Sequence, residues 1–591
     1  PDTIERLVKQ ADGNAFYLEE LIRAVAEGKD RALPDTVLAM VETRLARLPL
    51  EARRVLRAAS VFGEVSWESG VTLLLGGALS AAEIGDWLER LVEQEVLVAR
   101  PQSRFPGERE RAFRHAMLRE GAYTMLTDED RRLGHHLAGQ WLEQHGETEP
   151  MVLAGHFERG GDGTRAATYY LRASEQAFHV LDFDATVARA GLGLRCAPPE
   201  EIRVALLGMR CDAATQGLHL VSVTMADAEE LLRTAPRGSI PWAQAMQAYN
   251  AGLLLTGRTP DLLVSIDILR QVAPAPEALG RMSLVILNGI WNLDNLGYIR
   301  EGNALEERFF AVVSPAGGRE PLARFWWNVA IAMRGSYAHE DPWKALRYSD
   351  AIQELFDATG SELMFLNMQL FRGFNLWYLG APARAERTLE EIVAADETLG
   401  PVSSLRRFGL AWLYADRGAL EEARALATQL SEHGRATHNS LDEGRGRWAL
   451  AKALRRMGDL AGAEHELELA LRMTVTLEQP GVLASLAALR LAQGRAEEAV
   501  TTSADAVSRC TAMEGCGLFR GAFVRLVHAE ALHATGAHDA ARRAISEART
   551  HLFTIVDRLE DPEYKKSFLE NVPENARTLA LASAWLGDIN S

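Results

Sequence analysis

Residues 153–173 read LAGHFERGGDGTRAATYYLRA, and this stretch decides the fold. Apolar residues recur at helical spacing on both sides of Gly161. A small residue, Ala154, lies seven positions before that glycine, and a second, Ala166, lies five positions after it. Small residues let two helices approach closely, and glycine serves a sharp turn because positive φ is cheap only without a Cβ. The stretch therefore predicts a tightly packed helical hairpin.

The same pattern occurs five more times along the chain. The turn glycines are Gly380, Gly418, Gly458, Gly494 and Gly536, and consecutive ones are 36 to 42 residues apart. Each is followed five residues later by an alanine, namely Ala385, Ala423, Ala463, Ala499 and Ala541. Six concordant units favour a repeat array over an irregular helical bundle whose glycines fall there by chance. Between residues 199 and 350 the register fades, and we expect degenerate repeats there.

This pattern resembles the tetratricopeptide repeat (TPR). The best match lies at Leu153, Ala154, Phe157, Gly161, Ala166, Tyr170 and Ala173. Large apolar side chains such as Phe157 and Leu467 would fill the seam between paired helices. The resemblance implies a superhelix of stacked hairpins, whose concave face binds extended or helical partners.

Composition narrows the class of protein further. The chain has 591 residues, of which 47% are hydrophobic and 25% charged, so we expect a folded, soluble protein of several modules. With 81 acidic against 64 basic residues its net charge is -17, and such a surface repels phosphate backbones and anionic lipid. We expect neither a nucleic-acid partner nor a membrane span, since the best apolar run, 70–82, is short and broken by glycine. Four cysteines make no disulfide framework, which favours a reducing, cytoplasmic location.

A small domain with strands is predicted ahead of the array. Alternating residues at 96–100 and 111–114 flank a polar turn and indicate one β-hairpin. Three helices, expected at 51–62, 66–75 and 81–94, precede it, which is the winged-helix arrangement. Against DNA binding, the third helix carries four carboxylates (Glu83, Asp86, Glu89 and Glu93) and one basic residue, Arg90. We therefore expect this domain to dock within its own protein.

Several motifs outside the repeats resemble the STAND class of signalling ATPases. They are DGNAFYLEEL at 12–21, LPDTV at 33–37, RLARLP at 44–49, ARRVLRAASV at 52–61, FRH at 113–115, LRE at 118–120 with Tyr123, and SFLENVPENAR at 567–577. The resemblance is to large bacterial proteins in which a Ser/Thr kinase domain precedes such an ATPase and a TPR tail. Because the chain starts Pro1-Asp2-Thr3, without an initiator Met, we expect it to be a fragment of such a protein.

The resemblance implies a fold class and a domain order. The fold is expected to be all-α: a TPR-like α-solenoid preceded by ATPase lid helices and a small winged-helix domain with one β-hairpin. The predicted domains are lid helices at 1–48, a winged helix at 49–128, a helical linker with the first repeat at 129–200, degenerate repeats at 201–350, and TPR-like repeats with a C-terminal helical cap at 351–591.

The phosphate-binding half of the ATPase is missing from the chain. A Walker A loop needs GxxxxGK[ST], and the one Gly-Lys pair, Gly28-Lys29, lies in no such context. The lid motif has Ala15 where the family usually has proline, which leaves Asn14 and Phe16 as weak candidates for nucleotide contact. Kinase signatures are also absent from the sequence. We therefore expect no enzyme activity and no cofactor in this fragment, with ATP and Mg²⁺ bound only in the full-length parent.

No other chemistry emerges from the residue pattern. The fifteen histidines form no metal-ligand spacing; His135 and His136 are adjacent and must point in different directions on a helix. His115 is expected to pack or to cap a helix. Neither HExxH nor GxSxG occurs. We predict no catalytic residue and no metal site.

Aromatic residues are concentrated in the central repeats. The candidates for partner contact are Trp326, Trp327, Trp343, Trp377, Tyr378 and Trp412. They either pack between repeats or line a groove, since buried aromatic residues often anchor interfaces.

These observations lead to three functional hypotheses. In the first, the chain is the non-catalytic sensor arm of a STAND ATPase, and a protein or ligand bound on the TPR superhelix biases a nucleotide switch and an upstream Ser/Thr kinase. In the second, it is a constitutive TPR scaffold for a partner enzyme or effector. In the third, it is part of a STAND transcriptional activator, which would require a C-terminal helix-turn-helix.

Overall fold

The computed structural model describes residues 18, 22, 37–217, 220–316, 320–359, 362–392, 401–517 and 520–587. Within these ranges it contains 29 α-helices and three short strands, so the expected all-α fold with a TPR-like solenoid is confirmed. The chain divides into two compact units, Pro1–Arg210 and Cys211–Ser591. Most of the lid segment predicted at 1–48 lies outside the described residues, and so do Asn14 and Phe16.

The first unit begins with the small mixed domain. Its elements are α3 (Val37–Ala46), α4 (Leu50–Phe62), β1 (Val65–Trp67), α5 (Glu68–Leu75), α6 (Ala81–Glu93), β2 (Leu97–Ala99), β3 (Glu110–Phe113) and α7 (Ala116–Thr124). The three expected helices and the hairpin are present. The helix predicted to begin at Ser66 was wrong at its start, because 65–67 pair antiparallel with β3 as a third strand. The name winged helix for this domain stays our prediction.

Two of the four carboxylates of α6, Glu83 and Glu89, are engaged inside the domain. The side chain of Glu83 accepts from the backbone of Ser80, and the Ser80 hydroxyl accepts from the backbone of Glu83, which forms a capping box at the start of the helix. Glu89 lies 2.6 Å from the buried guanidinium of Arg111 on β3. The opposite face of α6 buries Ile84, Leu88 and Leu91. This helix therefore holds the small domain together through both its apolar and its acidic side chains.

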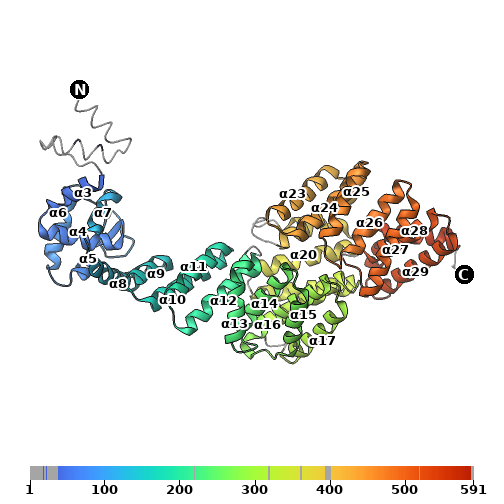
Figure 1. Ribbon diagram of the computed structural model, residues 1–591, viewed down its shortest axis with the longest axis horizontal. Helices are drawn as coiled ribbons and strands as arrows, with labels where there is room; N and C mark the ends of the chain where they lie inside the picture. Colours follow the sequence, from blue (N-terminus) through green and yellow to red (C-terminus); the bar gives the residue numbers. More distant parts are fainter. Residues whose placement is uncertain are drawn as a thin grey trace, which may run out of the picture. The chain divides into compact units, whose positions relative to one another are not determined.

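Helical hairpins make up the rest of the first unit, and they follow one another along the chain in Figure 1. They are built from α8 (Asp128–Gln144), α9 (Pro150–Arg159), α10 (Gly163–His179), α11 (Phe183–Arg195) and the start of α12 (Glu200–Gln216). Gly161 has φ +76° at the α9–α10 turn, as the sequence pattern predicted. Phe157 and Tyr170 are buried beside Ala154 and Ala166, so the predicted seam is confirmed.

The second unit consists of helices throughout its described residues. Its first half contains α13 (Val221–Thr234), α14 (Ile240–Leu255), α15 (Thr259–Gln271), α16 (Leu279–Asn295), α17 (Ile299–Ala316), α18 (Pro321–Tyr337) and α19 (Pro342–Thr359). Its second half contains α20 (Glu362–Tyr378), α21 (Pro382–Glu390), α22 (Pro401–Arg417), α23 (Leu420–Ala436), α24 (Ser440–Met457), α25 (Leu460–Met473), α26 (Gln479–Ala492), α27 (Ala496–Met513), α28 (Gly521–Ala534), α29 (His538–Val556), α30 (Pro562–Glu570) and α31 (Pro573–Leu586). The domain boundaries proposed at 200 and 350 stay predictions.

The repeat glycines take the conformation that their spacing predicted. Values of φ lie between +77° and +93° at Gly380, Gly418, Gly458, Gly494 and Gly536. The small residues also act as expected, since a Cβ added to Gly373 on α20 would lie 2.6 Å from the side chain of Leu389 on α21. Close helix pairing thus depends on both parts of the repeat pattern.

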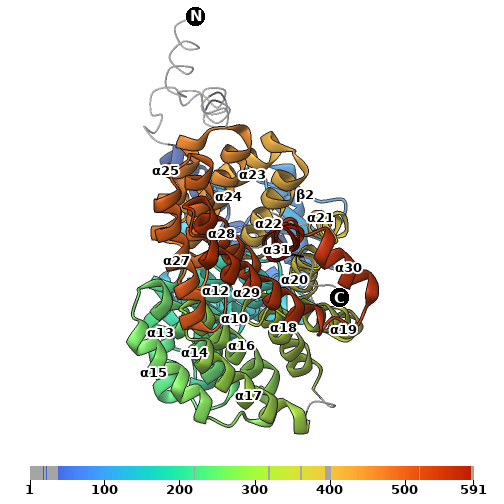
Figure 2. The ribbon, with the colours of Figure 1, turned by 90° about the vertical axis from the view of Figure 1, so that its right-hand side faces the viewer.

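The C-terminal helices fold back onto the α20–α21 turn. The hydroxyl of Ser567 donates to the carbonyl of Leu379 at 2.6 Å, and the amide of Asn571 donates to the carbonyl of Gly380 at 3.0 Å. The rings of Tyr378 and Phe568 meet edge to face, 5.7 Å apart. Helix α31 packs against α28 and α29, and Figure 2 shows it beside α28. This cap closes the second half of the unit on itself.

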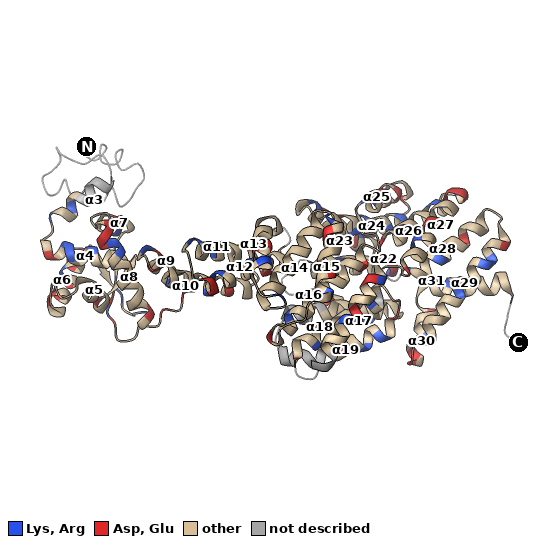
Figure 3. Ribbon diagram, turned by 60° about the horizontal axis from the view of Figure 1, so that its bottom comes forward, with Lys and Arg blue, Asp and Glu red and all other residues tan. Residues whose placement is uncertain are grey.

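Basic and acidic residues are both scattered over the helices of each unit (Figure 3). Among the described residues, no helix is long and apolar enough to cross a membrane, and no group of His, Cys, Asp and Glu could hold a metal ion. One feature was not predicted: Cys510 and Cys516 form a disulfide at the end of α27, and Cys196 and Cys211 are not part of it.

Candidate functional site

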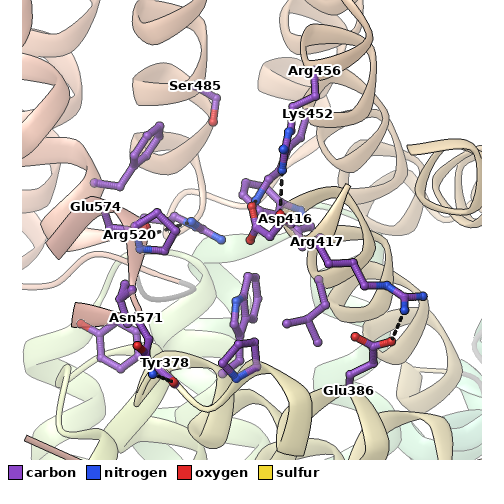
Figure 4. A pocket seen from close by; sticks show the side chains of 18 of the residues that line it. Tyr378, Glu386, Asp416, Arg417, Lys452, Arg456, Ser485, Arg520, Asn571 and Glu574 are labelled. Atoms are coloured by element: carbon purple, nitrogen blue, oxygen red, sulfur yellow. Dashed lines mark hydrogen bonds and ion pairs between the residues drawn. The ribbon is translucent and has the colours of Figure 1, made fainter. Parts of the chain in front are cut away.

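A cavity of about 1000 Å³ lies in the second unit, between the repeats and the C-terminal cap. Its walls come from α20, α21, α22, α24, α25, α26, α28, α31 and the turns beside them. The lining residues include Trp377, Trp412, Asp416, Lys452, Arg520 and Glu574, several of which Figure 4 labels. Because these residues are widely separated in the sequence, the cavity exists only when the array is closed.

Three tryptophans give the cavity an aromatic wall. Trp412 on α22 has its ring centroid 6.1 Å from that of Trp377 on α20 and 5.3 Å from that of Trp448 on α24. The indole N–H of Trp448 donates to the hydroxyl of Ser485 at 2.9 Å. The indole N–H of Trp412 is buried and has no hydrogen-bond partner among the described residues. Trp412 therefore has a buried donor that the described residues leave unused.

Two cations stack on the Trp412 ring. The ammonium of Lys452 lies 4.0 Å from the ring centroid, and the guanidinium carbon of Arg520 also lies 4.0 Å from it. Arg520 lies 5.3 Å from the centroid of Trp377 as well. Cation–π attraction compensates partly for taking such charges out of water. The ring of Trp412 thus holds together a charged cluster in the cavity wall.

Anionic partners of these two cations are few. Lys452 pairs with Asp416 at 2.6 Å, whereas Arg520 reaches Glu574 only at 3.5 Å (Figure 4). Burial lowers the pKa of Lys452 to about 8, an effect that Asp416 opposes and Arg520 reinforces. Burial lowers the pKa of Arg520 too, with Glu574 and Asp416 opposing it. A lowered pKa in a basic group means that its positive charge is incompletely compensated.

The acidic residues of the cavity lie mainly at the α21–α22 side. Glu386 forms an ion pair with Arg417 at 3.2 Å, and Glu390 accepts from the hydroxyl of Tyr414 at 2.7 Å. Burial raises the pKa of Glu386, which Arg417 opposes. These carboxylates are thus engaged with their own neighbours and away from the cluster on Trp412.

The side chains that line the cavity decide which chemistry it offers. The described lining contains no histidine or cysteine, and the hydroxyl of Ser485 donates to the carbonyl of Gly481 at 2.8 Å. The chemistry on offer is hydrogen-bond donation, positive charge and aromatic stacking.

Three of the six aromatic candidates line this cavity: Trp377, Tyr378 and Trp412. The other three lie elsewhere in the second unit. Trp326 and Trp327 pack against Phe325 and Phe309, with ring centroids 4.9 and 5.3 Å apart, and belong to a separate core. Trp343 packs against Tyr564 at 5.8 Å. Whether any of the six contacts a partner stays a prediction.

Sequence reasoning did not single out Lys452, Arg520 or Trp448. A signal was present for two of them, because Trp448 and Lys452 are four residues apart and so share one face of α24. The sequence contained no such signal for Arg520, because this residue comes near Trp412 only when the array folds back on itself.

Comparisons with known proteins add little to this picture. No family model and no curated protein matches the chain. Many solved structures align at low identity, and three of them serve as examples. A Rap protein complexed with Competence and Sporulation Factor has 13% identity and a TM-score of 0.39, over 62% of this chain and 99% of that one. A STAND protein with a tetratricopeptide repeat sensor from Pyrococcus horikoshii has 12% identity and a TM-score of 0.35, over 86% of this chain and 71% of that one. Yeast Tom70 has 12% identity and a TM-score of 0.33, over 78% of this chain and 96% of that one. At such scores none of the three contributes to a functional assignment.

Proposed function

We propose that this chain is a non-catalytic recognition arm that holds a ligand or a segment of a protein partner in the cavity of its second unit. The observation that carries the proposal is the cluster of Lys452 and Arg520 on the buried Trp412 ring. Buried cations beside an aromatic wall are costly in an empty protein and useful in a binding site. The cavity volume of about 1000 Å³ is large enough for a ligand of drug size or a short peptide.

Binding at this site would couple to the docking of the C-terminal cap. The wall includes Glu574 and Asn571 from the cap together with Trp412 and Lys452 from the repeats. A ligand that contacts both sides prefers the closed arrangement, and it shifts the population toward that arrangement by its differential affinity. The cap is therefore the element through which occupancy would be transmitted.

We extend the proposal to the parent protein on the strength of the motifs at 12–61 and 567–577. The arm would regulate a bacterial, cytoplasmic STAND-type ATPase that binds ATP and Mg²⁺ in upstream domains and is linked to a Ser/Thr kinase. The coding sequence ahead of Pro1 tests this part of the proposal. An intact Walker A loop and kinase motifs there would support it, and a different upstream domain would refute it.

A constitutive scaffold is the second candidate, and one observation favours it. Arg334 is buried against Asp294 with hydrogen bonds of 2.8 and 3.0 Å, a fixed contact between α16 and α18 that resists rearrangement. A scaffold would bind its partner without moving the cap. Hydrogen exchange at the backbone amides of α30 separates the two candidates, because only the regulatory arm slows exchange there on binding.

The chain offers a matched pair of variants for testing the cavity. Trp377 lines it, while Trp326 packs in a different core of the same unit. In pull-downs with the 591-residue chain, Trp377→Ala should lose a partner that wild type and Trp326→Ala both recover. Equal recovery by both variants, with both melting cooperatively, would place recognition outside the cavity and refute the proposal.

A further inference from the structure

The cavity presents two hydrogen-bond donors that the described residues leave unused. The Nε of Arg520 and the Nε1 of Trp412 are both buried without a partner. The two residues are only 6% and 4% exposed. A buried polar group left unpaired costs about 1–3 kcal/mol, so evolution rarely retains two in one site without a use. Because both groups can only donate, their complement is a hydrogen-bond acceptor.

The charge balance of the side chains that line the cavity also favours a negatively charged acceptor. Among the described lining residues, seven are basic and four are acidic. The whole chain has the opposite balance, with 64 basic and 81 acidic residues. The cavity lining is therefore a local region of positive charge in an acidic protein. Burial lowers the pKa values of Lys452 and Arg520, the two cations that lie on the Trp412 ring.

The protein's own carboxylates do not complete this cluster. Asp416 is 2.6 Å from Lys452, which leaves Arg520 with Glu574 at 3.5 Å as its anionic neighbour. Of the two cations, only Lys452 therefore has a carboxylate of the described residues within 3 Å. A further anion placed near the Trp412 ring would face two positive charges, and an electrostatic interaction of this kind is strong where water is excluded.

We propose that the cavity binds an organic anion whose carboxylate or phosphate oxygens accept hydrogen bonds from Arg520 and Trp412 beside Lys452, while its aromatic or apolar body lies against Trp377. This inference rests on the proposed function and names the chemistry of its ligand. A cavity of about 1000 Å³ exceeds what a bare inorganic ion fills, so the charged group is one end of a larger molecule.

Two fluorescent probes isolate the role of the charge. The first, 8-anilinonaphthalene-1-sulfonate, is an aromatic anion, and N-phenyl-1-naphthylamine is the same ring system without the sulfonate. In titrations of the 591-residue chain we expect the anion to bind about tenfold more tightly or better, since a hydrogen bond to a charged group contributes about 1.5–3 kcal/mol. Arg520→Met should remove most of that advantage and leave the affinity for the neutral probe unchanged.

Two more variants and a control keep the test decisive. Trp412→Phe keeps an aromatic ring and removes the Nε1 donor, and it should weaken the anionic probe about threefold to tenfold. Lys452→Met provides a readout if Arg520→Met does not melt cooperatively. Arg424→Gln on α23 removes an exposed arginine that pairs with Glu421 outside the cavity, and both probes should bind it as they bind wild type.

Competition identifies the anionic group. Tricarballylate displaces the anionic probe if the site prefers carboxylates, and inorganic pyrophosphate displaces it if the site prefers phosphates. Displacement by either supports the proposal, and displacement by neither overturns it.

The outcomes also separate this inference from the proposed function. If wild type binds both probes equally and Trp377→Ala weakens both, the cavity is a binding site for neutral ligands, and only the inference fails. If neither probe responds to any cavity variant, the cavity is not a recognition site, and the proposed function fails with it.

Discussion

Two buried arginines in the second unit differ in what surrounds them. Arg334 is fully enclosed by acceptors, with two hydrogen bonds to Asp294 at 2.8 and 3.0 Å and an ion pair with Glu306. Arg520 stacks on Trp412 and Trp377 instead, keeps a buried Nε without a partner among the described residues, and forms an ion pair with Glu574 at 3.5 Å. The first arrangement is complete and serves the fold. The second is incomplete, which is expected where a ligand supplies the missing acceptors.

The first unit shows a third way of burying a titratable group. His135 is hydrogen-bonded to Tyr123 at 2.8 Å and to His156 at 3.1 Å, so its ring nitrogens are both engaged. Burial lowers the pKa of His135 to about 3 and that of His156 to about 4, with neighbouring positive charges adding to the effect. This chain of side chains is stable because both histidines are neutral. The clusters around Arg334 and His135 thus have their hydrogen-bond partners within the protein. The cluster on Trp412 keeps two donors without an acceptor among the described residues.

The largest expected effect comes from breaking the complete cluster. Arg334→Met leaves the carboxylate of Asp294 buried without its partner, and the free energy of unfolding should fall by about 3–5 kcal/mol. Urea denaturation followed by circular dichroism measures it. Arg424→Gln, an exposed arginine, should change stability by less than about 1 kcal/mol. A loss for Arg334→Met no larger than for this control would contradict the comparison.

The histidine chain should make stability depend on pH with a predictable sign. Both folded-state pKa values lie below the ordinary 6.5, so the unfolded chain binds more protons and stability falls as the pH drops through 6.5 toward 4. Between pH 7 and pH 5 each histidine should account for about 2 kcal/mol. His156→Leu should reduce this loss in urea titrations at the two pH values. An unchanged loss in the variant would show that other groups control it.

The cap that completes the open cluster can be tested at Gly380. Its φ is +79°, and an added Cβ would overlap the main-chain carbonyl of Ser567 on α30. Gly380→Ala should cost about 2 kcal/mol or more, because left-handed strain contributes about 1–2 kcal/mol and the overlap adds to it. Binding of the anionic probe should also weaken, since the cap forms part of the cavity wall.

Gly418 provides the matched control for that variant. Its φ is +93°, but nothing lies within 4 Å of an added Cβ. Gly418→Ala should therefore show the backbone strain alone and leave probe binding intact. Equal effects of the two variants on probe binding would show that the cap does not contribute to probe binding in the cavity.

The smallest expected effect comes from the incomplete cluster itself. Arg520→Met removes a buried cation that lacks a close carboxylate, so stability should change by no more than about 1 kcal/mol in either direction. Thermal and urea denaturation beside Arg334→Met give the comparison directly. A loss as large as that of Arg334→Met would mean that Arg520 is structural and would remove the reason for assigning it to a ligand.

Local pattern was enough to predict the repeats but not the site. Gly380 and its counterparts could be read as turns, because a helical hairpin is specified by residues close in sequence. The strand at Ser66 and Trp67 was missed because three residues are too few to show alternation, and their pairing with β3 is non-local. Lys452 and Arg520 meet only because small rotations between successive hairpins add up to a closed array. Such rotations depend on packing across every seam, and no short pattern in the sequence records them.

The contact between α30 and the α20–α21 turn also fixes how many hairpins this part of the chain can contain. Stacked-repeat proteins ordinarily tolerate the gain or loss of a unit, since each hairpin touches only its neighbours. Here the hydrogen bonds from Ser567 and Asn571 to the carbonyls of Leu379 and Gly380 join the two ends of the stack. Duplicating or deleting one hairpin between α22 and α29 would pull those ends out of register. The repeat number in this segment is therefore a constrained quantity, like the strand number of a closed barrel.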